Sequence, residues 1–150
     1  MRFSLWLGRI LFGGYFFFSG LNHFAHLSKL TSYAASKGVP LPELAVALSG
    51  ALIVLGGLSV LLGFMPRVGL TLILLFLVPV TLIIHNFWTL PEPERMMQLG
   101  QFLKNTGLVG ACFAMLALPV PWPGSVFAKR QKEKAEHPPT DWLTGRRLPQ

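Results

Sequence analysis

The stretch "LAVALSGALIVLGGLSVLLGFMPRVGLTLILLFLVPVTLIIHNFW" (Leu44–Trp88) decides the fold, because Arg67 is the only charged side chain within it. Arg67 separates two uncharged runs, residues 44–66 with 23 residues and residues 68–91 with 24 residues. The first run ends in the short link "GFMP". A helix that crosses a bilayer needs about 20 largely apolar residues, each of which adds about 1.5 Å. Helices are expected because lipid offers no water to satisfy open backbone groups. The stretch therefore predicts two spanning helices joined by a tight hairpin.

Two further windows without Asp, Glu, Lys or Arg lie between Arg9 and Lys29 and between Lys104 and Lys129. The chain of 150 residues is 52% hydrophobic and only 13% charged, whereas a soluble domain carries about 25% charge. We therefore predict an all-α integral membrane four-helix bundle. It forms one domain over residues 1–122, with helices at about 4–28, 43–64, 67–88 and 100–120.

The distribution of basic residues predicts the topology. Four spans place both termini on one side, together with Arg67 and most of the basic residues of the C-terminal tail. The positive-inside rule then puts both termini in the cytoplasm. The tail, residues 123–150, is polar and basic, and we expect it to be disordered or to lie on anionic lipid. Membrane orientation explains the net charge of +7, so a nucleic-acid partner is not expected.

Several residues are assigned to turns, packing or orientation. Small residues let helices approach closely in lipid, and glycine and proline mark turns. Arg9 is expected to snorkel to the inner headgroups, and the lone cysteine, Cys112, to serve as small apolar packing. The residues assigned to packing or turns are Gly20, Gly38, Pro40, Gly57, Gly63 and Arg67.

Polar residues of three helices are predicted to share one layer near the outer surface. His23 lies roughly 28 Å above Ser4, and His85 roughly 27 Å above the start of its helix, at about 1.5 Å per residue. Lys104 falls in the first turns of the last helix, at the same height. The predicted layer consists of Asn22, His23, His26, His85, Asn86, Lys104 and Asn105.

Two interpretations of this layer stay open. It can form a polar pocket, in which histidine exchanges protons, binds a metal or donates to a quinone carbonyl. Alternatively, these side chains simply tolerate the hydrated interface, and Lys104 snorkels. His23 and His26 are a weak metal signal without a carboxylate in any span, so metal and haem are not favoured. A single cysteine cannot form an internal disulfide or a CxxC pair, so redox work would need a cofactor, a substrate or a partner.

The ordered segments "GRILFGGYFFFSGLNHF", "SKGVP", "LGGLSVLLGFMPR", "HNFW" and "FLKNTGLVGA" resemble the DoxX family of small four-helix membrane proteins. The resemblance runs from about Gly8 to Leu118. It implies a multi-pass protein of the bacterial inner membrane associated with redox or oxidative-stress complexes, since the family name comes from a subunit of a thiosulfate:quinone oxidoreductase. The matching residues are Gly20, Gly38, Pro40, Gly57, Gly63, Arg67, His85, Phe87, Lys104 and Asn105.

Two positions depart from the family pattern. Many relatives carry a lysine where this chain has His23, and a glutamate where it has Ile53. Both charges of a potential pair are lost together, which avoids an uncompensated buried glutamate. The departure weakens the transfer of any chemistry that depends on that pair.

Two functions compete at this stage. One is a membrane subunit of a redox system that binds quinone or a small sulfur or thiol substrate, with His85, His23, Lys104 and Asn105 orienting it. The other is a non-catalytic scaffold whose tail recruits a partner enzyme. A transporter is disfavoured because no span carries an acidic residue. No self-contained catalytic motif is present, and substrate, electron donor, partner and oligomeric state, including a homo-oligomer, are not predicted.

Overall fold

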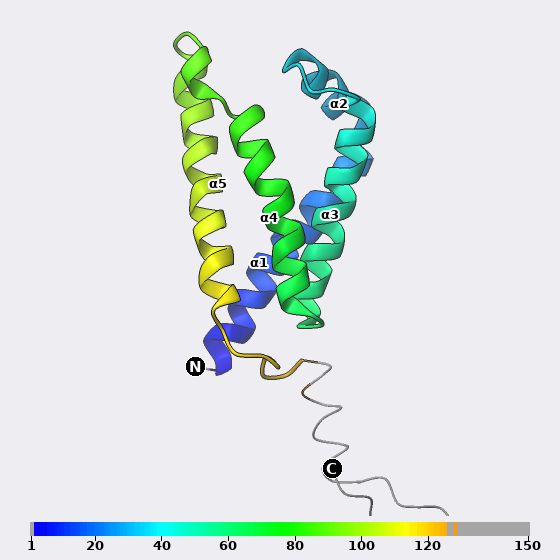
Figure 1. Ribbon diagram of the computed structural model, residues 1–150, viewed down its shortest axis with the longest axis vertical. Helices are drawn as coiled ribbons and strands as arrows, with labels where there is room; N and C mark the ends of the chain where they lie inside the picture. Colours follow the sequence, from blue (N-terminus) through cyan, green and yellow to red (C-terminus); the bar gives the residue numbers. More distant parts are fainter. Residues whose placement is uncertain (1, 126–127, 129–150) are drawn as a thin grey trace, which may run out of the picture.

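The computed structural model describes residues 2–125 and residue 128, and this part of the chain is all-helical. The prediction of an all-α fold is confirmed, and the four predicted long helices are present (Figure 1). A further short helix was not predicted. The elements are α1 (Arg2–Ala25), α2 (Leu27–Ser36), α3 (Pro42–Leu62), α4 (Pro66–Ile83), the 3-10 helix η1 (Phe87–Thr89) and α5 (Glu94–Leu116).

The unpredicted helix α2 follows a break at His26, whose backbone angles of φ −122° and ψ 30° leave the helical range. Its apolar or small side chains recur at helical spacing and turn toward α3, with Ala34 buried. Gly38 then adopts a φ of +73° in the turn between α2 and α3. The helix predicted to end near residue 28 therefore ends at Ala25.

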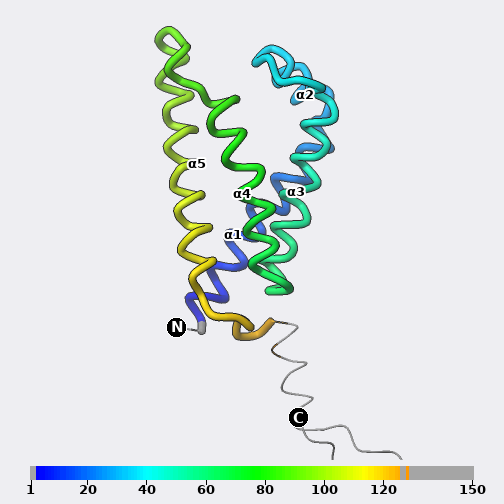
Figure 2. Tube along the Cα trace, in the orientation of Figure 1, coloured from blue at the N-terminus to red at the C-terminus, as the bar shows by residue number. Residues whose placement is uncertain are grey.

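The helices are arranged as an open bundle in which α1 packs along α3, α3 and α4 form a hairpin, and α5 packs on α4. Figures 1 and 2 show the N-terminus and the segment after α5 at one end of the molecule. The short helix α2 and the start of α5 lie at the opposite end. The two ends are called here the terminal end and the far end.

Glycines bring α1 and α3 into backbone contact. A Cβ atom built on Gly57 would lie 2.7 Å from the carbonyl oxygen of Gly13 and closer still to the amide nitrogen of Phe17. One on Gly20 would lie 2.8 Å from the amide nitrogen of Val54. Such distances leave no room for a side chain at Gly20 or Gly57, so the two helix backbones approach closely there.

The hairpin between α3 and α4 is as short as expected. Gly63 ends α3 with a φ of +65°, and Pro66 opens α4. The Ser59 hydroxyl stabilises the turn by donating to the carbonyl oxygens of Phe64 and Met65, at 2.5 and 3.1 Å. Arg67 is exposed on this hairpin. At the other end α4 stops at Ile83, five residues before the predicted end, so His85 and Asn86 lie in the turn that precedes η1.

The expectation that Arg9 snorkels to the headgroups is wrong, because its side chain is only 3% exposed. Its guanidinium donates to the carbonyl oxygens of Val60 (3.3 Å), Leu61 (3.1 Å) and Pro123 (3.0 Å). The first two belong to the last turn of α3, where free carbonyls carry partial negative charge. Trp122 is buried against this guanidinium. Arg9 thus ties α1, α3 and the segment after α5 together.

Packing at the terminal end continues past the predicted domain boundary. Ser125 is fully buried and its hydroxyl accepts from the amide of Ala128. The rest of the predicted tail, with its expected contact to anionic lipid, lies outside the described residues.

Two described segments have the length and apolar composition to cross a membrane: α3 (Pro42–Leu62) and the segment Pro66–Thr89, which comprises α4 and η1. Of an apolar stretch of 18 residues within each segment, only 33% and 28% is buried within the protein. The core helix of a soluble protein would be mostly buried, whereas these helices expose large apolar side chains on their outer faces. The further spans predicted over 4–28 and 100–120, and the cytoplasmic side of the termini, stay predictions.

Candidate ligand cavity

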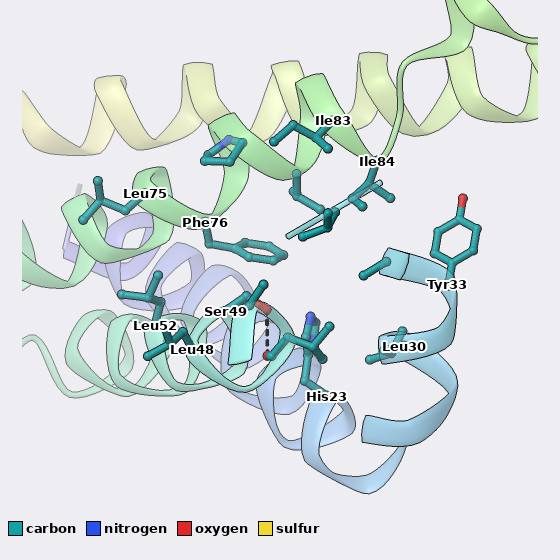
Figure 3. A pocket seen from close by; sticks show the side chains of 16 residues that line it. His23, Leu30, Tyr33, Leu48, Ser49, Leu52, Leu75, Phe76, Ile83 and Ile84 are labelled. Carbon is teal, nitrogen blue, oxygen red and sulfur yellow. Dashed lines mark hydrogen bonds between the residues drawn. The ribbon is translucent and has the colours of Figure 1, made fainter. Parts of the chain in front are cut away.

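A cavity of about 270 Å³ lies between α2, α3 and α4 at the far end of the bundle (Figure 3). Its size is slightly below the roughly 300–1,000 Å³ of pockets for drug-sized ligands, so it suits a single-ring group. The walls are almost entirely apolar. They are formed by Leu30, Ala34, Val39, Ala45, Val46, Leu48, Leu52, Leu75, Phe76, Pro79, Val80, Ile83 and Ile84, with the polar side chains His23, Tyr33 and Ser49.

His23 reaches the cavity from α1 because Gly50 leaves room for it. A Cβ atom on Gly50 would lie 3.0 Å from the Cβ atom of His23. The His23 ring is held from two sides, through Nδ1 at 2.8 Å from the carbonyl oxygen of Ser19 and by an edge-on contact with Phe76, with 5.7 Å between ring centroids. The contact with Ser19 occupies Nδ1, so Nε2 is the ring nitrogen of this cavity-lining residue that has no hydrogen bond among the described residues.

Ser49 is the second polar side chain in the wall. Its hydroxyl donates to the carbonyl oxygen of Val46, one turn earlier in α3, at 2.8 Å. Figure 3 shows Ser49 and His23 close together on one side of the cavity, with Phe76 facing them. Both polar groups are therefore fixed by backbone carbonyls of their own helices.

A chain of hydrogen bonds crosses the far end beside the cavity. Tyr33 of α2 accepts from Nε2 of Gln98 at 3.2 Å, and Oε1 of Gln98 lies 2.7 Å from Nδ1 of His85. Tyr33 lines the edge of the cavity, whereas Gln98 belongs to α5. This bridge, Tyr33–Gln98–His85, links the short helix α2 to α5 and to the end of α4.

The rim of the cavity is apolar and exposed. Leu48, Leu75 and Ile83 are 55%, 58% and 47% exposed. A second apolar hollow of about 310 Å³ adjoins the cavity along α4 and shares Leu75 and Pro79 with it. A molecule dissolved in lipid could thus enter from the side, with a ring in the cavity and a chain along α4.

The structure separates the predicted polar layer. His23 lines the cavity, and His85 is connected to its edge through Gln98. Asn22 and His26 are exposed, and Nδ1 of His26 lies 3.2 Å from the carbonyl oxygen of Asn22. None of the remaining members of the layer is part of the cavity wall.

Those other members have separate surroundings. Lys104 is exposed and donates to Gln101 at 2.7 Å. Asn105 is 5% exposed on α5. The Oδ1 atom of Asn86 is buried, with no hydrogen-bond partner among the described residues.

Sequence reasoning missed Tyr33, Ser49 and Gln98. Tyr33 was missed with the whole of α2, and Gln98 was placed before the last helix. Ser49 could have been found from the sequence, because it is a polar residue that precedes Gly50 within an otherwise apolar run. Within residues 2–125, no three His, Cys, Asp or Glu side chains gather in a way that could hold a metal ion.

An all-helical chain whose apolar helix faces are exposed, and whose cavity has an apolar exposed rim, defines a small helical membrane protein. This chain belongs to the DoxX family, whose model matches residues 4–86, more than half of the sequence. The matched range includes all the cavity-lining residues. The family assignment confirms the resemblance drawn from the sequence segments.

A curated relative is the inner membrane protein YphA of Escherichia coli (strain K12). It is 27% identical over 99 residues, which cover 66% of this chain and 69% of the relative. No solved structure matches the chain.

Proposed function

We propose that this protein binds a lipophilic, quinone-type molecule in the cavity between α2, α3 and α4, as a membrane subunit or partner of a redox system. The observation that carries the proposal is the cavity itself: apolar walls, an exposed apolar rim, and a histidine fixed within it. Membership of the DoxX family and the name of its inner-membrane relative support a place in the bacterial inner membrane.

The walls determine the kind of ligand. A charged or strongly polar molecule would lose its hydration without compensation, since only three polar side chains line the cavity. A flat ring fits better, because Phe76 and the His23 ring, which touch edge-on, both provide aromatic surface in the cavity wall. The apolar hollow of Leu75, Val78 and Pro79 continues from the rim and offers a seat for an isoprenoid or acyl chain.

The geometry also suggests which histidine matters most. The sequence favoured His85, but His23 is the histidine in the cavity wall. His85 contacts Gln98 at the end of the bridge and would act through the position of Tyr33. The predicted four-span topology would place this site toward the outer leaflet.

The test is native mass spectrometry of the protein after gentle extraction from its own membrane, followed by lipid extraction and identification of the bound molecule. Ala45→Phe, which fills the cavity, should abolish the bound mass. Ala35→Phe is the matched control, because Ala35 is exposed on α2 and does not line the cavity. A bound quinone that survives Ala45→Phe, or a protein that carries and binds none, would refute the proposal.

The scaffold hypothesis depends on the tail, which lies outside the described residues. It predicts that deletion of residues 129–150 abolishes co-purification of a partner while the bundle stays folded. If co-purification is unchanged, recruitment by the tail fails.

A further inference from the structure

His23 and Ser49, the polar side chains of the inner cavity wall, already donate their hydrogen-bond protons to backbone carbonyl oxygens of their own helices. The carbonyl oxygen of Ser19 can only accept, so the Nδ1 atom of His23 must carry the proton that joins them. In the neutral imidazole, Nε2 then holds a lone pair and can only accept. The wall therefore offers an acceptor at this point.

Ser49 presents the same chemistry. Its single hydroxyl proton is donated to the carbonyl oxygen of Val46, so the hydroxyl oxygen can only accept a hydrogen bond from a bound ligand. His23 and Ser49 lie together in the wall (Figure 3). The third polar side chain, Tyr33, stands at the edge, where its oxygen accepts from Gln98 of α5, so its hydroxyl proton can be donated only at the edge and not at the inner wall formed by His23 and Ser49.

We infer that the cavity selects ligands whose head group donates hydrogen bonds, so that the hydroxyl-bearing quinol is bound in preference to the carbonyl-only quinone. A quinol hydroxyl donates to Nε2 of His23 or to Oγ of Ser49, whereas a quinone carbonyl meets lone pairs at both atoms. This inference rests on the proposed function and adds the preferred form of the ligand. It concerns binding alone and includes no electron-transfer step.

The preference follows from the cost of unmatched polar groups. In an apolar cavity, two acceptors brought together lose their hydration and gain no bond. The donor-bearing head gains a bond at the same place. We expect the quinol to bind about tenfold more tightly than the quinone, which corresponds to about 1.4 kcal/mol.

The experiment measures binding of decylubiquinol and decylubiquinone to the full-length protein in detergent, without oxygen, by microscale thermophoresis. His23→Phe keeps a ring beside Phe76 and removes one of the two acceptors, so most of the tenfold affinity ratio should be lost through weaker quinol binding. His23→Gln places an amide oxygen where Nε2 stood and should retain most of the ratio. Ser49→Ala should reduce the ratio by a smaller factor.

The outcomes separate the two proposals. Equal binding of both forms to the unchanged protein, or a ratio that persists in His23→Phe, overturns the donor preference and leaves the ligand site in place. Binding of neither form overturns the proposed function and this inference with it. A ratio that is retained in His23→Gln and lost in His23→Phe is a result that a merely structural role of His23 would not produce.

Discussion

Replacing Gly57 by alanine tests the close contact between α1 and α3 on which the bundle depends. The new Cβ atom would lie 2.7 Å from the carbonyl oxygen of Gly13, which is 0.7 Å short of the 3.4 Å of ordinary contact. The obstructing atoms belong to the backbone, so the clash cannot be relieved by a rotamer change. The two helices must move apart, and overpacking of this kind costs roughly 1–3 kcal/mol.

The assay is thermal unfolding of the purified protein in detergent, with Gly14→Ala as the matched control. Gly14 is the neighbour of Gly13 in α1, but a Cβ atom there would meet nothing within 4 Å. Gly57→Ala should lower Tm by about 2–12 °C, since a cost of roughly 1–3 kcal/mol corresponds to about 2–4 °C per kcal/mol at this chain length. Gly14→Ala should leave Tm unchanged or raise it, because alanine favours helix. Equal Tm values for the two variants would refute the close-contact argument.

Three further predictions concern the terminal end, the hairpin and the bridge. Arg9→Met should destabilise the fold by about 2–3 kcal/mol, because it removes the donor that now satisfies the carbonyl oxygens of Leu61 and Pro123, whereas Arg67→Met on the exposed hairpin should change stability by less than about 0.5 kcal/mol. Similar unfolding curves for both would contradict this role of Arg9. Met65→Gly should stabilise the protein by about 1 kcal/mol, because Met65 has a φ of +47° and glycine adopts this conformation without penalty; a lower Tm would count against it. Tyr33→Phe should speed hydrogen exchange in residues 27–36 about fivefold, since one bond that ties α2 to α5 is lost, with the exposed Tyr15→Phe as control; unchanged exchange would show that the bridge does not hold α2.

The long helices were predictable because uncharged runs of membrane length leave few alternatives, and Gly63 with Pro66 marks the hairpin. The end of α4 was not predictable from hydropathy. "IIHNFW" is as compatible with a helix as the residues before it, yet the chain turns after Ile83. The break at His26 was missed for the same reason, since neither proline nor glycine marks it.

Part of the site was predicted from the sequence, because the position of a residue along its helix gives its depth in the membrane. Counting residues from the helix starts placed His23 near the far end, and His23 does line the cavity. Depth says nothing about which side of a helix a residue occupies, so Asn22 and His26 were grouped with it although they are exposed. Arg9 was misjudged because a sequence does not show that the last carbonyls of another helix lie beside it. The fully buried Ile53 agrees with the absence of a charge at that position.

Binding of a lipophilic ligand in the cavity can be tested most directly by photo-cross-linking in native membrane vesicles. A quinol analogue with a photoreactive group on its chain would be activated, and the labelled peptides would be mapped by mass spectrometry. The cavity between α2, α3 and α4 predicts labels on the exposed rim at Leu48, Leu75 and Ile83, with loss of labelling in Ala45→Phe. Labels spread over the outer faces of α1 and α5, or labelling unaffected by Ala45→Phe, would contradict it.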